Sequence, residues 1–364
     1  MKVLVTGASG FVGRYLIPSL LAAGHEVWGT HSNGLTKRSG SSGEGDFSWS
    51  LIQSQSSNEL SRGHEDLGTA SPQRGTWSSI QMDIRDQAAV ERVVREVQPE
   101  AVIHLAAISS VQRSWQEPGS VLETNIIGSL NLFSAFAKLN PGGILLSIGS
   151  SEEYGPPRSL PITEDHPTKP VNPYGISKLA QGHLAMQFYR QYGLNAIHLR
   201  PFNHIGPGQA LGFVASDFAF QIARIEAGLA PAEIVVGNLG AERDFLDVRD
   251  VVSAYLLALS RAEPGRVYNL ASGRSYQIRQ VLDILLALAR RPIRVSVDPA
   301  RLRPVEVPTL VGDASSFRQA TGWEPRHTLE GSLRDILNYW RGVVSGEGRE
   351  SEEGTRGNDP ATGL

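Results

Sequence analysis

Short apolar runs alternate with longer amphipathic stretches over the first 202 residues. The run at residues 2–6 ends at Gly7, as a buried parallel strand would, and helical spacing follows it as far as Gly24. Because strands that alternate with helices of this length wind into a parallel sheet, the pattern predicts a doubly wound α/β fold. The expected strands are 2–6, 26–30, 79–83, 101–106, 144–148 and 195–202, and the expected helices are 11–23, 87–98, 121–139 and 174–192.

Three segments depart from this alternation. Residues 32–76 are rich in Ser, Gly, Gln and Asn and show little periodicity, which predicts a flexible, solvent-exposed insertion. Beyond residue 202 the pattern becomes irregular and rich in Pro and Gly, as in a smaller lobe, and after residue 342 it becomes rich in Gly, Glu and Arg. We therefore expect a first domain at 1–202, a C-terminal lobe mainly at 203–342 and a disordered tail at 343–364.

Composition narrows the class of protein. Hydrophobic residues make up 40% and charged residues 20%, as in a soluble globular enzyme, and a net charge of −3 gives no electropositive field for nucleic acid or an anionic membrane. The absence of cysteine excludes disulfides and thiolate metal sites. No apolar run has membrane-spanning length and no signal-peptide pattern opens the chain, which predicts a cytoplasmic protein. His198 and His204 flank a strand end without a carboxylate cluster, so we expect no metal site.

Three glycines lie between the first strand and the first helix. Gly7 permits a tight turn, Gly10 lets the backbone approach a pyrophosphate, and Gly13 lets helix and strand pack closely. The helix N-terminus, at Phe11 and Val12, then supplies free N–H groups to the phosphates. A glycine triplet alone is also explained as a structural turn, but its place after a strand and before a helix favours dinucleotide binding by these five residues.

A second candidate pattern is Tyr174-Gly-Ile-Ser-Lys178, which places tyrosine and lysine four residues apart on one helix face. A nearby ammonium favours the phenolate, so we expect Lys178 to lower the pKa of Tyr174. An amphipathic helix with a partly buried Tyr and a Lys that reaches solvent explains the pair alone equally well. Ser150 adds a polar group just past the strand 144–148, at the carboxyl end where parallel sheets bind ligands.

Together, the glycine spacing and the Ser150, Tyr174 and Lys178 set resemble the extended short-chain dehydrogenase/reductase family, also known as the NAD-dependent epimerase/dehydratase family. The resemblance implies a Rossmann domain with a smaller C-terminal substrate-binding lobe. It also implies that Ser150 bonds the reacting sugar oxygen, that Tyr174 is the general acid/base, and that Lys178 bonds the nicotinamide ribose.

The residues after Ser150 bear on the type of reaction. Glu152 falls where the 4,6-dehydratases of this family keep a general base, and the preceding Ser151 resembles the GDP-mannose branch. Both are expected to face the substrate. Ser151 and Glu153 are equally well explained as solvated loop residues.

Cofactor contacts are implied at two further places. Asp83 and Ile84 resemble the adenine-contacting pair, and Leu105, Ala106 and Ala107 resemble the loop beside the nicotinamide ribose. The second strand ends in 30–33 without a carboxylate that would repel a 2′-phosphate, and Lys37 and Arg38 follow. We therefore expect NADP(H), with NAD(H) as the second option.

Three C-terminal stretches, 202–209, 242–245 and 301–308, together with 212–214, resemble the subfamily of GDP-4-keto-6-deoxy-D-mannose reductases. Each stretch alone is also explained as a surface loop held by a salt bridge. The resemblance implies NAD(P)H-dependent reduction of a GDP-linked 4-keto sugar to GDP-D-rhamnose. It implies substrate contacts from Asn203, Arg243, Arg303 and Glu306.

Two other functions stay open at this point. One is a GDP-mannose 4,6-dehydratase that uses Glu152 as its base, and the other is a non-catalytic dinucleotide sensor, against which the intact triad argues. The family resemblance also implies a homodimer formed by helices 121–139 and 173–192. Phe133, Phe136, Leu184 and Phe188 offer apolar surface there, although each is equally suited to pack inward on the sheet.

Overall fold

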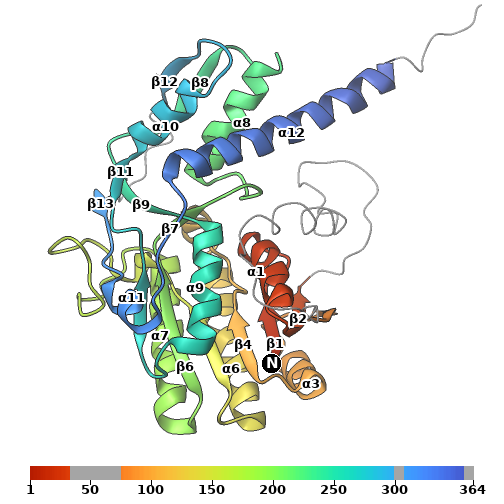
Figure 1. Ribbon diagram of the computed structural model, residues 1–364, viewed down its shortest axis with the longest axis vertical. Helices are drawn as coiled ribbons and strands as arrows, with labels where there is room; N and C mark the ends of the chain where they lie inside the picture. The colour runs from red at the N-terminus through yellow and green to blue at the C-terminus, as the bar shows by residue number, and fades with distance from the viewer. Residues whose placement is uncertain (33–74, 299–306, 356–364) are drawn as a thin grey trace, which may run out of the picture.

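The computed structural model describes residues 1–32, 75–298 and 307–355, with side chains described as far as residue 346. Its largest sheet has seven parallel strands in the order β10-β6-β5-β4-β1-β2-β3, which confirms the doubly wound parallel sheet (Figure 1). The order reverses between β1 and β4, where the carboxyl ends of parallel strands open a ligand-binding crevice. The strands are β1 (Lys2–Thr6), β2 (Glu26–His31), β3 (Trp77–Gln81), β4 (Ala101–His104), β5 (Ile144–Ile148), β6 (Asn195–Pro201) and β10 (Val267–Leu270).

Helices cover both faces of this sheet because successive strand residues point to opposite sides. Val3 and Val5 of β1 lie in one buried core and Leu4 lies in the other. The first core is completed by α1 (Phe11–Ala22), α9 (Val248–Arg261) and α11 (Ser315–Thr321). The second is completed by α3 (Gln87–Val97), α6 (Gly128–Leu139) and α7 (Pro173–Tyr192).

Local signals set the ends of these helices. The Asp86 carboxylate accepts from the N–H of Ala89 and so caps α3. Asn172 caps α7 by accepting from the N–H of Gly175, and Pro173 occupies the first helical position. At α1 the cap position is Gly10, whose lack of a side chain leaves the first N–H groups without a side-chain cap.

The helix expected over 121–139 is built as three consecutive segments. α5 (Pro118–Leu122) leads into a π-helical turn, Glu123–Ile127, and then into α6. The turn contains Asn125, whose buried side chain bonds both main-chain groups of Ile108 and the Ser177 hydroxyl. Those partners lie far away in sequence, so helical periodicity alone did not predict the turn.

The C-terminal lobe has its own apolar core and lies beyond β7 in Figure 1. α8 packs against α12 and α10, and β9 joins β11, β13 and β7. The predicted boundary at residue 202 needs correction, because α9 and β10 return to the Rossmann layer and β10 pairs with β6. The lobe elements are β7 (Asn203–Ile205), α8 (Val214–Glu226), β8 (Glu233–Val236), β9 (Glu242–Asp247), β11 (Ser275–Gln277), α10 (Ile278–Ala287), β12 (Arg294–Val297), β13 (Thr309–Leu310) and α12 (Leu329–Thr355).

The expected tail is also corrected, because α12 continues through residues 343–355. The glycines in this stretch disfavour helix, but Glu, Arg and Ser dominate it, and the helix is already anchored by buried Leu333, Ile336 and Leu337. Residues 356–364 and most of the predicted insertion, 33–74, lie outside the described residues. Among the described helices, none is long and apolar enough to cross a membrane.

The four apolar residues considered for a dimer surface pack inward on the sheet instead. Phe133, Phe136 and Phe188 are buried in the core shared by α3, α6 and α7, and Leu184 packs against that core. The exposed apolar side chains on α6 and α7 are different ones, namely Leu130, Leu139, Ile176, Tyr189 and Tyr192, and Ile127 is exposed in the turn before α6.

Candidate active site

A cavity of about 790 Å³ lies at the carboxyl ends of the main strands. It contains all the positions expected to contact the dinucleotide, drawn from the turn after β1, the segment after β3 and the loop after β4. Those lining residues are Gly7, Gly10, Phe11, Val12, Gly13, Asp83, Ile84, Leu105, Ala106 and Ala107. Ser150, Tyr174 and Lys178 line the same cavity.

Two glycines of the turn, Gly7 and Gly13, are packed too closely against other backbone for a side chain. Gly7 has φ +69°, and a Cβ there would lie 2.7 Å from the main-chain nitrogen of Ala106. At Gly13 a Cβ would lie 2.1 Å from the carbonyl oxygen of Ala8, inside the contact between turn and helix. The turn therefore fits a dinucleotide pyrophosphate, for which backbone must approach closely at a helix N-terminus.

Buried side chains hold the loop after β4 beside this turn. Thr6 Oγ1 lies 2.7 Å from His104 Nδ1, and His104 Nε2 lies 2.9 Å from Ser129 Oγ. Burial lowers the pKa of His104 to about 3, so this histidine is a neutral structural link. Thr6 Oγ1 also accepts from the Ala106 N–H at 3.3 Å, which fixes the loop that lines the cavity.

Ser150 and Glu153 cap the short 3₁₀ helix Ser151–Glu153 reciprocally. The Ser150 hydroxyl accepts from the N–H of Glu152 at 3.2 Å, and the Glu153 carboxylate accepts from the N–H of Ser150 at 2.9 Å. The interpretation of Ser151 and Glu153 as solvated loop residues is therefore wrong, since both are buried. Ion pairing with Arg200 makes that burial feasible for Glu153.

Tyr174 and Lys178 lie on one face of α7, at the wall of the cavity. Burial raises the pKa of Tyr174 above its usual value, against an opposing hydrogen bond with Ser150. The expected lowering of that pKa by Lys178 is not found, because burial outweighs the Ser150 hydrogen bond and the charges of Glu152 and Glu153 raise the pKa further. The Lys178 ammonium instead donates to the carbonyl of Ile148 at 2.8 Å and to Gln181 Oε1 at 3.0 Å. Burial lowers the pKa of Lys178 to about 8.

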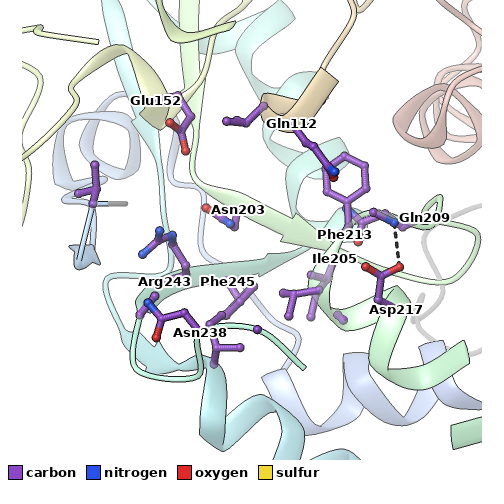
Figure 2. Close-up of a pocket in the computed structure, with 18 of the residues that line it drawn as sticks. Gln112, Glu152, Asn203, Ile205, Gln209, Phe213, Asp217, Asn238, Arg243 and Phe245 are labelled. Carbon is purple, nitrogen blue, oxygen red and sulfur yellow. Dashed lines mark hydrogen bonds between the residues drawn. The ribbon is translucent and has the colours of Figure 1, made fainter. Parts of the chain in front are cut away.

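A second cavity, of about 620 Å³, adjoins the first and reaches into the lobe. Glu152 and Asn203 line both cavities. Figure 2 shows the Glu152 carboxylate and the Arg243 guanidinium facing the same open space from opposite sides, with Asn203 beside it. Glu152 Oε2 accepts from Asn172 Nδ2 at 2.8 Å, so its side chain is oriented by the cap residue of α7.

Several lining residues were not predicted from the sequence. Gln112 and Trp115 come from α4 (Val111–Gln116), a helix too short to show periodicity but marked by its cap Ser110. Phe213 and Asn238 come from lobe loops (Figure 2). Tyr255 of α9 reaches the first cavity with a buried hydroxyl that has no hydrogen-bond partner among the described residues. No local sequence signal marks it.

Two predicted substrate contacts, Arg303 and Glu306, lie outside the described residues. Val307, which follows them, lines the second cavity. Within the described parts of the chain, no three His, Asp or Glu side chains gather as metal ligands would. His198 pairs with Glu153, and the His204 ring stacks on Phe11.

Comparison with known proteins places the chain among nucleotide-sugar enzymes. A family model described as GDP-mannose 4,6-dehydratase matches residues 43–336. The chain is 35% identical to the GDP-6-deoxy-D-mannose reductase of Pseudomonas aeruginosa, over 95% of this chain and 99% of that protein. It is 29% identical to the GDP-mannose 4,6-dehydratase of Vibrio cholerae, over 92% of each chain.

Solved structures agree with these relatives. The structure of RMD from Pseudomonas aeruginosa complexed with NADPH superposes with a TM-score of 0.75 at 32% identity, over 94% of this chain and 100% of that one. The UDP-glucose 4-epimerase of Thermus thermophilus in complex with NAD has a TM-score of 0.75 at 28% identity, over the same shares. The likeness covers both the Rossmann layer and the lobe.

Proposed function

The chain belongs to the GDP-mannose 4,6-dehydratase family, and we propose that it is the family's reductase type, which converts GDP-4-keto-6-deoxy-D-mannose to GDP-D-rhamnose. The observation that carries this proposal is the continuous cleft. Ser150 and Tyr174 line a cavity shaped for a dinucleotide, and that cavity shares Glu152 and Asn203 with a second one that leads to Arg243. A keto sugar at the junction would reach both reacting groups, with its nucleotide toward Arg243.

The first cavity fits NADP(H), and NAD(H) as the second option. Gly7 and Gly13 leave room for the pyrophosphate, and the buried hydroxyl of Tyr255 offers a donor that nothing else in the described chain satisfies. Thr30 and His31, which line the cavity at the end of β2, bring no carboxylate against a 2′-phosphate. Lys178 would bond the nicotinamide ribose. When bound, NADPH supplies the hydride that reduces the ketone carbon.

Tyr174 is suited to give the ketone oxygen its proton. Burial raises the pKa of its phenol, so the group stays protonated at neutral pH and is ready as a general acid. The Ser150 hydroxyl forms a hydrogen bond with Tyr174 and would stabilise the charge that develops on the ketone oxygen. Both residues are buried, so little reorganisation accompanies the transfer.

One observation favours the dehydratase as the alternative. Glu152 lines the cleft at the position of a general base, and the matching family model is described by the dehydratase activity. Dehydration, however, begins with oxidation of a sugar alcohol, for which Tyr174 would have to accept a proton. The raised pKa keeps Tyr174 protonated before the reaction, which is the state from which a reductase begins.

The direct assay of this proposal supplies the 4-keto sugar with NADPH. We expect one NADPH consumed for each GDP-6-deoxyhexose formed, and deuterium at the fourth sugar carbon when the cofactor carries deuterium on its transferable position. Loss of NADPH without a labelled product would contradict the proposal.

We also propose a cytoplasmic homodimer that pairs α6 and α7 of two copies. The support is the exposed apolar set Ile127, Leu130, Ile176 and Tyr189, which lies on or beside these helices. Light scattering at micromolar concentration should give twice the chain mass, and Leu130→Arg should shift it to the monomer. Monomer only, in the wild type, would contradict this proposal.

A further inference from the structure

Glu153 is a fully buried carboxylate directly beneath the reacting centre, and the proposed mechanism gives it no role. Its Oε1 accepts from the N–H of Ser150 at 2.9 Å and lies 3.0 Å from His198 Nε2. Its Oε2 accepts from Arg200 Nε at 2.7 Å. Although burial alone would raise it, the contacts with His198, Arg200 and the N–H of Ser150 lower the pKa of Glu153 to about 2, so the group is charged.

The contacts continue from Glu153 to Lys178. His198 Nδ1 lies 3.0 Å from Ser147 Oγ, and Gln181 Nε2 donates to the same hydroxyl at 3.0 Å. Gln181 Oε1 in turn accepts from Lys178 Nζ at 3.0 Å. With hydrogen on Nε2, His198 donates to Glu153 and accepts from Ser147, so every donor in this chain of contacts has an acceptor.

Two glycines beside the Glu153–His198 pair leave no space for a side chain of their own. A Cβ at Gly149 would lie 2.1 Å from Glu153 Oε1, and one at Gly182 would lie 2.6 Å from His198 Nε2. Gly149 lies between β5 and Ser150, and Gly182 lies in α7 one turn after Lys178. The Glu153–His198 pair therefore packs directly against the two segments that carry the catalytic side chains.

We propose that Glu153 is a positioning residue for the reductase reaction proposed above, holding the main chain of Ser150 and, through the contacts just described, the ammonium of Lys178. It touches neither substrate nor cofactor. A buried network in which each polar group is paired fixes its members in one arrangement, whereas removal of one member leaves the others without a partner.

The electrostatics of Lys178 agree with this role. The charged and titratable groups around it are Glu153, Tyr174 on its own helix, His104 on β4, and His198 on β6, which also carries Arg200. Burial lowers the pKa of Lys178 to about 8, and the Glu153 charge opposes that lowering. Neutralising Glu153 should thus lower the pKa of Lys178 further.

Glu153→Gln is the first test because it keeps the shape and removes the charge. We expect kcat to fall about 10–100-fold, the scale of a hydrogen bond to a charged group. NADPH affinity, read by fluorescence titration without substrate, should decline with rising pH from a point about one pH unit lower than in the wild type. Folded Glu153→Gln with wild-type kcat and wild-type pH dependence of NADPH binding would overturn the proposal.

Glu226→Gln is the matched control, since Glu226 is also nearly buried and paired with an arginine, Arg341 at 2.7 Å, but lies in the lobe. It should lose stability and keep the pH dependence of NADPH binding. If it shifts that pH dependence as much as Glu153→Gln does, a general structural effect explains both variants and the proposal is wrong.

If Glu153→Gln fails to fold, His198→Asn tests the positioning role of Glu153. Asn keeps a polar atom near Ser147 but cannot reach Glu153, while the Glu153–Arg200 pair stays in place. NADPH affinity should fall about 3–10-fold, and unchanged affinity would overturn the proposal. The titrations need no sugar substrate, so they remain decisive even if the wild type does not reduce the keto sugar and the proposed function fails.

Discussion

The two halves of the cleft are built in different ways. In the cofactor half, polar side chains such as Lys178, His104 and Asn125 are buried, and each has at least two hydrogen-bond partners in the Rossmann layer. The outer half is assembled from α4, β7, β9 and lobe loops, and Asn203 and Phe213 there stay partly exposed. Chemistry therefore rests on preorganised groups, while substrate selection rests on several independent segments.

This difference implies that substitutions in the two halves affect different kinetic constants. Loss of a group in the cofactor half removes an interaction made in the transition state and should lower kcat. Loss of a group in the outer half removes binding that ground state and transition state share, and should raise KM for the sugar nucleotide.

The largest effect is expected from Tyr174→Phe, which removes only the phenolic oxygen and its proton. Turnover measured as NADPH oxidation at saturating substrate should fall about 10²–10⁴-fold, since general acid–base help is worth that much. The fold and NADPH affinity should stay near those of the wild type, because the Lys178 contacts do not include Tyr174. Near-normal turnover would remove Tyr174 from the proposed chemistry.

Arg243→Gln should act on the outer half. Its guanidinium lines the second cavity and donates to the carbonyls of Glu242 and Pro308. We expect KM for the sugar nucleotide to rise about 10–100-fold, the scale of a charge-assisted hydrogen bond, with kcat changed far less. Arg243→Lys keeps the charge but loses the planar pair of donors, so its KM should lie between those of the wild type and Arg243→Gln. A fall in kcat at unchanged KM would break the division between the halves.

A smaller effect is expected from Glu152→Gln, at the junction of the two halves. In a reductase Glu152 would only orient a sugar hydroxyl, so loss of its charge should cost about 10-fold in kcat/KM, the scale of one modest hydrogen bond. Asn172 still has an acceptor in the amide oxygen of the new side chain. Steady-state kinetics with the 4-keto sugar measure this, and a complete loss of reduction would contradict the assigned role.

The positions that the sequence predicts for the cofactor half come together in one cavity, and their signals are local. The strand–turn–helix of Gly7–Gly13 and the Tyr174–Lys178 spacing each lie within a few residues, and all the expected cofactor positions line one cavity. The outer half could not be predicted to the same extent, because short α4 and Tyr255 of α9 reach the cleft only through tertiary packing. The return of β10 to the main sheet was missed for the same reason.

The sequence of β6 indicates a buried polar pair, but it does not indicate that Glu153 is the partner of that pair. His198 and Arg200 stand two apart in a strand that is otherwise apolar from Ala196 to Pro201, so both point to one face of a buried sheet. Buried polar groups need partners, and the carboxylate that His198 requires comes from the short 3₁₀ helix Ser151–Glu153, 45 residues away in the sequence. That partner is fixed by topology, which periodicity does not contain.

The most direct test of the reductase assignment compares two substrates with the wild type and with Glu152→Gln. Each enzyme is incubated with GDP-mannose plus NADP⁺ and with GDP-4-keto-6-deoxy-D-mannose plus NADPH, and the products are separated. The account predicts fast reduction of the keto sugar, slow or no conversion of GDP-mannose by the wild type, and measurable reduction by Glu152→Gln. Fast conversion of GDP-mannose by the wild type, lost completely in Glu152→Gln, would contradict the account and make the enzyme a dehydratase.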